Sequence, residues 1–266
     1  MRVLVVLAHP EPQSLNVALS KVIAEELQTG GHEVQVSDLY AMGWKSNIDR
    51  ADFPTFPKDK PLAIAKASQL AYTAAHLTED VMAEQKKLLW ADTVILQFPL
   101  WWFSMPAILK GYVDRVWSCG FAYGVGEHSD KRYGDRYGEG VFAGKRAMLV
   151  VTAGGWESHY SARGINGPID DLLWPINHGI LYYPGFTVLP AFVAFRVDRY
   201  DKAAFDATAD RLRERIRTLS ATDPIPFRPQ NMGDYEIPAM VLRDDIQSEG
   251  QEGFKLHQAP SSEKQL

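Results

Sequence analysis

Two kinds of hydrophobic pattern alternate along the chain. Short, continuous apolar runs rich in β-branched residues are predicted strands, at residues 2–8, 32–40, 92–98, 144–155 and 185–195. Stretches with apolar residues at every third or fourth position are predicted helices, at 15–29, 63–77, 79–91, 106–117 and 201–219. A further helix over 168–181 is expected to be broken at Pro175. Continuous apolar strands indicate burial on both faces, and the alternation predicts an α/β fold: a doubly wound parallel sheet with helices on both faces.

Two regions depart from this pattern. Residues 43–61 contain three prolines and many charges, which predicts a long loop. From residue 223 the chain is proline-rich and loses its periodicity. We therefore expect a domain over 1–222 and a C-terminal extension over 223–266 that wraps on it, with the last dozen residues disordered.

The composition is that of an ordinary soluble protein, with 46% apolar and 23% charged residues. A net charge of −5 without any basic block gives no reason to expect nucleic acid. The single cysteine, Cys119, excludes an internal disulfide and a CxxC site, and no metal site is predicted. No apolar run approaches the roughly 18 residues of a membrane span, and the apolar N-terminus is expected to be a strand rather than a signal peptide. We expect a cytoplasmic protein.

The first candidate binding segment, "AHPEPQSLN", follows the first strand. Ser14 can cap the next helix, and the backbone N–H groups around Leu15 and Asn16 would then form an anion site for a phosphate or pyrophosphate. His9 could hydrogen-bond such a group. Alternatively, Ser14 only caps the helix and His9 only supports the strand end. A GxGxxG fingerprint is absent, and "VFAGKRAM" fails as a phosphate-binding loop because Glu139 and Arg146 stand at essential positions.

Two further segments should meet the first at the carboxyl edge of the sheet, where ligands bind in such folds. In "QFPLWWF" three consecutive aromatics cannot all point inward, so at least one should be open to a flat heteroaromatic ligand, unless the loop is a core plug. In "TAGGWESHY" the two glycines let backbone approach a ligand, and Tyr160 is a donor that could stabilise the charge of a reduced flavin. The alternative is that the glycines only make a tight turn.

Several separate motifs carry a family resemblance that spans nearly the whole chain. These motifs are "LAHPEPQSLN", "QFPLWWFSMPAILKGYVDRV", "FAYG", "TAGGWESHYSARGING", "LLWPINHGILYYPGF" and "TDPIPF". Together they resemble the NAD(P)H:quinone oxidoreductases of the DT-diaphorase type, which are flavodoxin-like flavoproteins. The resemblance implies a tightly bound FAD, with Ser14 to Asn16 at the pyrophosphate. The residues implied to hold the flavin are His9, Ser14, Leu15, Asn16, Pro99, Leu100, Trp101, Trp102, Phe103, Thr152, Ala153, Gly154, Gly155 and Tyr160.

The resemblance also implies a homodimer with two active sites at its interface. Tyr123 and Tyr183 would cover the partner's flavin and, with Trp102 and Phe103, would line the quinone site. Tyr160 and Asn166 stand at the family's catalytic positions, but Asn166 replaces a histidine of some members and cannot take up a proton.

Two other departures from the family pattern concern the acceptor pocket and the contacts to the adenine end of FAD. Val125 stands where an aromatic residue is common, which predicts a wider acceptor pocket. The adenine-side contacts of the family do not align, and Arg196 and Arg199 are only nearby candidates.

We expect a ping-pong cycle in which NAD(P)H, the co-substrate, passes a hydride to the flavin and a quinone then collects it in a two-electron step. Three alternatives remain at this stage. The first is a flavodoxin-type electron carrier with FMN, against which the aromatic wall and the C-terminal segment argue. The second is an accessory subunit of a membrane transporter. The third is a flavin, azo- or nitroreductase with the same chemistry.

Overall fold

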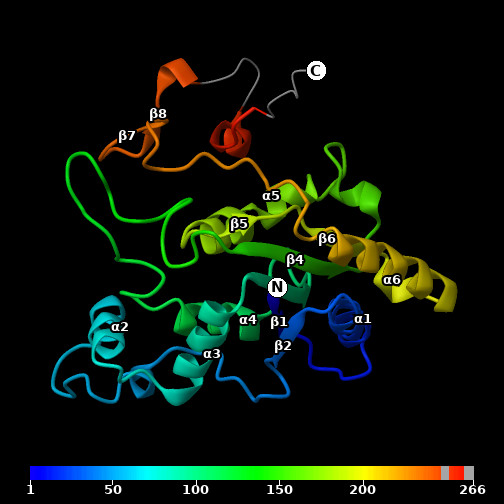
Figure 1. Ribbon diagram of the computed structural model, residues 1–266, viewed down its shortest axis with the longest axis horizontal. Coiled ribbons are helices and arrows are strands. Elements are labelled where there is room, and N and C mark those ends of the chain that lie inside the picture. The colour runs from blue at the N-terminus through cyan, green and yellow to red at the C-terminus, as the bar shows by residue number, and fades with distance from the viewer. Residues whose placement is uncertain (247–251, 261–266) are drawn as a thin grey trace.

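The computed structural model of the chain describes residues 1–246 and 252–260. Its centre is a six-stranded sheet in the order β2-β1-β3-β4-β5, with β6 also paired to β4 (Figure 1). Every pairing in this sheet is parallel. The strands are β1 (Arg2–Leu7), β2 (Glu33–Asp38), β3 (Thr93–Pro99), β4 (Arg146–Ala153), β5 (Thr187–Val188) and β6 (Phe192–Phe195). The predicted parallel α/β sheet is therefore confirmed.

Helices cover both faces of the sheet. They are α1 (Leu15–Thr29), α2 (Ile64–Thr73), α3 (Glu79–Trp90), α4 (Ala107–Val116), α5 (Ile169–Trp174) and α6 (Lys202–Arg217). Val3 and Val5 of β1 pack with α1 and α6 on one face, while Leu4 and Val6 pack with α2 to α5 on the other. This alternation buries each central strand on both sides, as its continuous apolar sequence requires. Within the described residues, no helix is both long and apolar enough to cross a bilayer.

Two predicted elements differ in detail from the structure, and a proline is involved in both. The single strand expected over 185–195 is two strands, because Pro190 cannot donate to the ladder: β5 pairs with the beginning of β4 and β6 with its end. The helix expected to break at Pro175 instead continues as a π-helical segment over Pro175–Tyr182. Pro175 is the first residue of that segment, so its missing N–H falls at the junction between the α-helical and π-helical hydrogen-bond patterns.

The long 43–61 loop is irregular, as predicted, apart from a 3₁₀ turn over Arg50–Asp52. Two contacts fix it to α4. The Arg115 guanidinium donates to a carboxylate oxygen of Asp52 at 2.8 Å, and both side chains are buried. Gly111 lies so close to Ser46 that a Cβ there would stand 1.8 Å from the Ser46 carbonyl oxygen. A buried ion pair and a close backbone approach thus hold a segment that has little regular structure of its own.

The C-terminal extension crosses the α5 side of the domain (orange to red in Figure 1). It contains a two-stranded antiparallel hairpin of β7 (Tyr235–Glu236) and β8 (Val241–Leu242) and a 3₁₀ turn over Gly253–His257. Phe254 stacks on Trp174 with the ring centroids 4.8 Å apart. Of the last dozen residues, which are predicted to be disordered, residues 255–260 belong to the described part of the chain, and Gln258 there forms a bridge to Phe227. Residues 261–266 lie outside the described residues.

His178 links the domain to this extension and makes the stability of the fold dependent on pH. It stacks between Tyr137 and Trp174, each at 4.7 Å. Burial, followed by the proximity of His257, lowers the pKa of His178 from 6.5 to about 4. The unfolded chain therefore binds this proton more tightly than the folded one. The contribution of neutral His178 is fully present above about pH 6.5 and is lost as the pH falls toward 4.

We expect His178→Phe to reduce the loss of stability between pH 7 and pH 5, because a phenyl ring keeps the stacking without titrating. Urea unfolding midpoints at both pH values measure this. The matched control is His159→Phe at an exposed histidine, which should retain the pH dependence of the parent. His257, whose pKa is also lowered by burial and by Arg228, should leave part of the dependence in place. A His178→Phe variant that loses as much stability as the parent would contradict this assignment.

Candidate functional site

A cavity of about 380 Å³ opens at the carboxyl edge of the sheet, where the loops after β1, β3, β4 and β6 meet. Its lining residues are His9, Leu15, Asn16, Pro99, Leu100, Trp101, Thr152, Gly154, Val197 and Asp198. Three sequence segments that were predicted to converge therefore line one cavity. Since the strands are parallel, their ends are brought to the same edge irrespective of their separation along the chain.

The beginning of α1 supplies backbone donors to this cavity. Ser14 caps the helix, and its hydroxyl oxygen accepts a hydrogen bond from the Val17 amide at 3.3 Å. The backbone N–H groups of Leu15 and Asn16 have no hydrogen-bond acceptor among the described residues. His9 accepts from the Glu11 amide at 3.1 Å, so one ring nitrogen supports its own loop. The helix start thus offers two free N–H groups and the positive end of the helix dipole to an anion.

A buried set of hydrogen bonds fixes this helix start relative to the sheet. The side-chain amide of Asn16 donates to the Thr152 hydroxyl at 2.8 Å, and the side-chain amide of Gln97 donates to the backbone carbonyl oxygen of Asn16 at 2.6 Å. Their three side chains are almost fully buried. The side-chain oxygens of Asn16 and Gln97 have no partner in the described part of the chain. They are acceptors that a ligand or water at the cavity could satisfy.

The three consecutive aromatics project outward from a tight turn. Trp101 and Ser104 exchange backbone hydrogen bonds at 3.0 and 3.1 Å, and Trp102 and Phe103 between them have φ values of 49° and 63°. Such left-handed residues cost about 1–2 kcal/mol each when they are not glycine. The side chains are 42%, 94% and 49% exposed for Trp101, Trp102 and Phe103. The loop is therefore not a core plug, and Trp101 forms the aromatic side of the cavity.

The loop after β4 contributes Gly154 to the lining of the cavity, and Gly155 and Tyr160 follow it in the same loop without lining the cavity. The amides of Gly154 and Gly155 donate to no acceptor in the parts of the chain the structure describes. A Cβ on Gly155 would stand 3.0 Å from the Tyr160 ring, so that ring lies directly against this glycine. Ala153, the last residue of β4, is buried beneath them. The two glycines thus do more than make a turn, because their bare backbone leaves room for the ring and for the cavity.

Asn166 and the two tyrosines predicted at a substrate site lie outside this cavity. Asn166 belongs to the same loop as Tyr160, and its amide donates to the His159 carbonyl at 3.0 Å. Tyr123 and Tyr183 instead line a separate cavity of about 400 Å³ together with α4 residues. A single chain therefore does not bring these tyrosines to Trp101.

Two lining residues, Val197 and Asp198, were not predicted. They follow β6, whose carboxyl end lies at the same edge as that of β4. The sequence contained enough information to predict them, because the predicted strand ends at residue 195 and the loop that follows a parallel strand lies at this edge of the sheet. Asp198 lies against Gly154, where a Cβ would stand 2.5 Å from its carboxylate. Arg196, next to them, stacks over Trp156 at 3.4 Å in a left-handed conformation.

Known proteins share this architecture along nearly all of their length. Residues 1–216 match a family described by its flavodoxin-like fold. The "ribosyldihydronicotinamide dehydrogenase-like protein traD" of Penicillium crustosum is 62% identical over 97% of this chain and 95% of that protein. NAD(P)H dehydrogenase (quinone) 1 of Rattus norvegicus is 39% identical over 93% and 88%. A crystal structure from Klebsiella pneumoniae, assigned as a quinone reductase, is 58% identical, with a TM-score of 0.95 over 97% of this chain and 100% of that one.

The parallel sheet, the helix start and the cavity at the carboxyl edge define a flavodoxin-like protein. With the similarity just described, the chain belongs to the flavodoxin-like family, among the NAD(P)H:quinone oxidoreductases. The resemblance read from the sequence motifs is thereby confirmed.

We expect Thr152→Val to destabilise the protein by about 1–3 kcal/mol, because it leaves the buried Asn16 amide without its acceptor. Urea unfolding measures the change. The matched control is Thr93→Val on β3, since the Thr93 hydroxyl is buried but contacts only the Met1 sulfur at 3.9 Å. If the two variants lost the same free energy of unfolding, the hydrogen bond between Thr152 and Asn16 would not contribute to stability beyond the loss of a buried hydroxyl.

Proposed function

We propose that this chain is an FAD-dependent NAD(P)H:quinone oxidoreductase that reduces quinones to hydroquinones in a two-electron, ping-pong cycle. The observation that carries the proposal is the cavity at the sheet edge, where unpaired backbone donors lie beside an aromatic wall. The names of the relatives support the reaction, since NAD(P)H dehydrogenase (quinone) 1 and the quinone reductase of Klebsiella pneumoniae are similar over almost the whole chain.

The residues of the cavity fit a flavin dinucleotide. Leu15 and Asn16 would hold the pyrophosphate with their free amides, because a helix start favours anions. Trp101, Trp102 and Phe103 would flank the ring system, for which Leu100 and Pro99 form the floor. The amides of Gly154 and Gly155 would reach the polar pyrimidine side. Asn16 and Gln97 each keep one buried oxygen without a partner, which suits a ligand rich in hydroxyl and N–H donors.

When bound, FAD supplies the redox chemistry, accepting a hydride from NAD(P)H and returning it to a quinone. The protein's own part is to orient the reactants and to stabilise charge. Tyr160, whose ring lies against Gly155, would donate a hydrogen bond where negative charge develops on the reduced flavin. Asn166 in the same loop offers an amide, which can hold a carbonyl oxygen but cannot relay a proton. The turn of Trp102 and Phe103 excludes water from one side of the ring.

We infer that the active protein is a homodimer. Tyr123 and Tyr183 line a cavity of their own, about 400 Å³ in volume, at the α4 side of the chain. In the proposed dimer, this cavity would face the flavin of the partner, and Val125 would leave the acceptor pocket wide. The one cysteine, Cys119, is a buried free thiol, which suits a reducing compartment such as the cytoplasm.

The names of two relatives favour ribosyldihydronicotinamide as a second candidate reductant. The Penicillium crustosum relative at 62% identity and a human relative at 38% identity are both named for ribosyldihydronicotinamide rather than NAD(P)H. Ribosyldihydronicotinamide lacks the adenylate half of NAD(P)H, so it would need no contacts beyond the ring and ribose. Turnover with NADH, NADPH and ribosyldihydronicotinamide, each with the same quinone, decides between them.

The proposal is tested on the purified full chain. We expect a yellow protein that releases one FAD per chain on denaturation, is bleached by anaerobic NAD(P)H and is reoxidised by a quinone. Sedimentation of the active preparation should give twice the chain mass. A colourless protein that cannot be reconstituted with FAD overturns the proposal, whereas release of FMN favours the electron-carrier alternative. An active monomer would contradict the placement of Tyr123 and Tyr183.

We expect Tyr160→Phe to slow flavin reduction by about 10- to 100-fold, because a hydrogen bond to a charged group contributes about 1.5–3 kcal/mol. FAD should stay bound, since the helix start that would hold the pyrophosphate is unchanged. Stopped-flow reduction by NAD(P)H measures the effect. Tyr200→Phe is the matched control, as its hydroxyl bonds Thr208 on α6 at 2.9 Å, and Asn166→Ala should have a smaller effect. A Tyr160→Phe variant with the parent's rate and flavin potential would disprove the role.

A further inference from the structure

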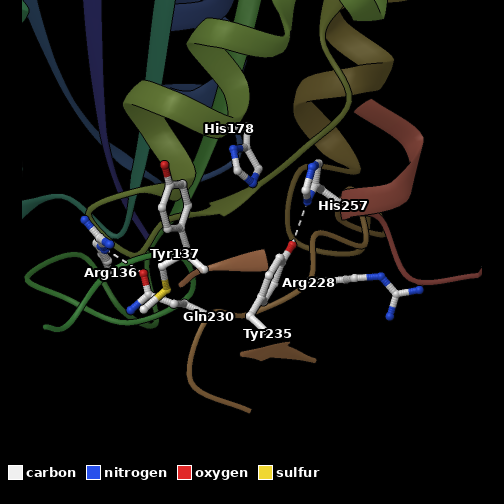
Figure 2. Close-up of a pocket in the computed structure, with 8 residues that line it drawn as sticks. Arg136, Tyr137, His178, Arg228, Gln230, Tyr235 and His257 are labelled. Carbon is white, nitrogen blue, oxygen red and sulfur yellow. Dashed lines mark hydrogen bonds between the residues drawn. The ribbon is translucent and has the colours of Figure 1, made fainter. Parts of the chain in front are cut away.

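A third cavity, of about 240 Å³, lies between the domain and the C-terminal extension (Figure 2). Its lining residues are Arg136, Tyr137, His178, Arg228, Gln230, Tyr235, Met240 and His257. None of them lines the cavity at the carboxyl edge of the sheet. The proposed oxidoreductase chemistry uses none of them either.

Arg136 gives this cavity a positive charge without a compensating carboxylate. Its Nε donates to the side-chain oxygen of Gln230 at 2.5 Å, and its Nη1 makes a long contact of 3.5 Å with the Tyr183 hydroxyl. The guanidinium also lies over the Tyr133 ring at 4.7 Å. In residues 1–246 and 252–260 it forms no ion pair. Its Nη2 group therefore keeps its donors for a ligand, and a carboxylate is the partner that a guanidinium binds best.

The orientation of Arg136 is fixed by a buried neighbour. Gln230 is almost fully buried, and its amide nitrogen donates to the Tyr133 carbonyl at 2.9 Å. This bond leaves the side-chain oxygen of Gln230 to face Arg136, as the dashed line in Figure 2 shows. The guanidinium is thus held in place before any ligand arrives, which reduces the entropy that binding costs.

Flat rings form the walls of the cavity. Figure 2 shows Arg136 and Tyr137 on one side, Tyr235 and His257 on the other, and His178 between them. Tyr235 and His257 stack at 5.9 Å with their planes only 10° apart, and the Tyr235 hydroxyl lies 2.9 Å from the His257 ring nitrogen Nδ1. The His178 ring has no hydrogen-bond partner in the described part of the chain, although the backbone carbonyl of this residue accepts from the Tyr183 amide. Such walls favour a planar ligand that stacks and offers an acceptor.

The remaining charges do not oppose an anion. Arg228 also lines the cavity, but its guanidinium donates to Asp234 at 2.7 Å and to the Leu256 carbonyl at 3.0 Å. Its charge is therefore largely compensated within the extension. No acidic side chain is among the residues that line the cavity. Arg136 remains as the one uncompensated charge of the lining that the structure describes.

We propose that this cavity binds a small planar aromatic carboxylate. The carboxylate pairs with the Nη2 side of Arg136, and the ring stacks among Tyr137, Tyr235 and the two histidines. A cavity of about 150 Å³ is enough for a benzene ring, so 240 Å³ accommodates one ring with its carboxylate. A dinucleotide is too large for this volume. The lining shares no residue with the cavity proposed for FAD, although Arg136 contacts Tyr183, which in the proposed dimer would lie at the quinone site.

The experiment is calorimetric titration of the full-length protein with benzoate, and with benzyl alcohol as its uncharged counterpart. We expect benzoate to bind one site per chain and benzyl alcohol to bind at least about tenfold more weakly. Arg136→Gln should weaken benzoate binding about tenfold or more and should abolish the preference for benzoate. Arg213→Gln removes the same charge from the exposed surface of α6 and should bind benzoate as the parent does.

A second variant locates the site independently of charge. Met240 lines the cavity from the extension and is only half-buried, so Met240→Trp fills the cavity with little strain on the core. It should abolish benzoate binding while thermal unfolding stays close to that of the parent. Benzoate binding that survives both Arg136→Gln and Met240→Trp, or that is absent from the parent protein, overturns the proposal. Loss of binding in Arg213→Gln would also overturn it, because only net charge would then be at work. FAD content and quinone turnover are measured separately, so their failure is distinguishable from this result.

Discussion

The buried hydrogen bonds among Asn16, Gln97 and Thr152 are the constraint on which the rest of the site depends. They join the first turn of α1 to the ends of β3 and β4, three segments that lie far apart in the sequence. Buried polar groups are costly unless they are paired, so these bonds favour only one relative position of helix and strands. Leu15 and Asn16 of the helix start and Gly154 of the loop after β4 are thereby held around a single cavity.

The turn of Trp102 and Phe103 has a shape that lowers the stability of the fold. Two bulky residues adopt left-handed backbone conformations and leave large apolar surfaces in water, both of which oppose folding. Neither feature helps the isolated chain. We propose that a flat ligand or a second subunit covers these rings and offsets both costs, in which case the turn has its binding shape before the partner arrives.

The sequence was sufficient to predict the sheet, because continuous apolar strands and periodic helices leave few arrangements that bury both. It was also sufficient for most of the cavity, since loops after parallel strands must meet at one edge. It could not place Tyr123 and Tyr183 relative to a bound flavin, because the placement that we propose for them depends on a second chain. Asp198 was missed although the loop after β6 had to reach the same edge. The cavity around Arg136 was not predicted either. It forms between the loop that contains Arg136 and Tyr137 and the C-terminal extension, and neither segment has a periodic hydrophobic pattern.

The stacking of Phe254 on Trp174 has a consequence for how such chains diverge. Trp174 and His178 form an aromatic surface on the domain, which Phe227 and Phe254 of the extension cover. A relative without this extension would present those rings to water, where they would promote aggregation. Loss of the extension and replacement of these large rings by smaller or polar residues should therefore occur together. The identity of the residues at positions 174 and 178 thus becomes a marker, within the domain itself, of whether a related chain carries the C-terminal segment.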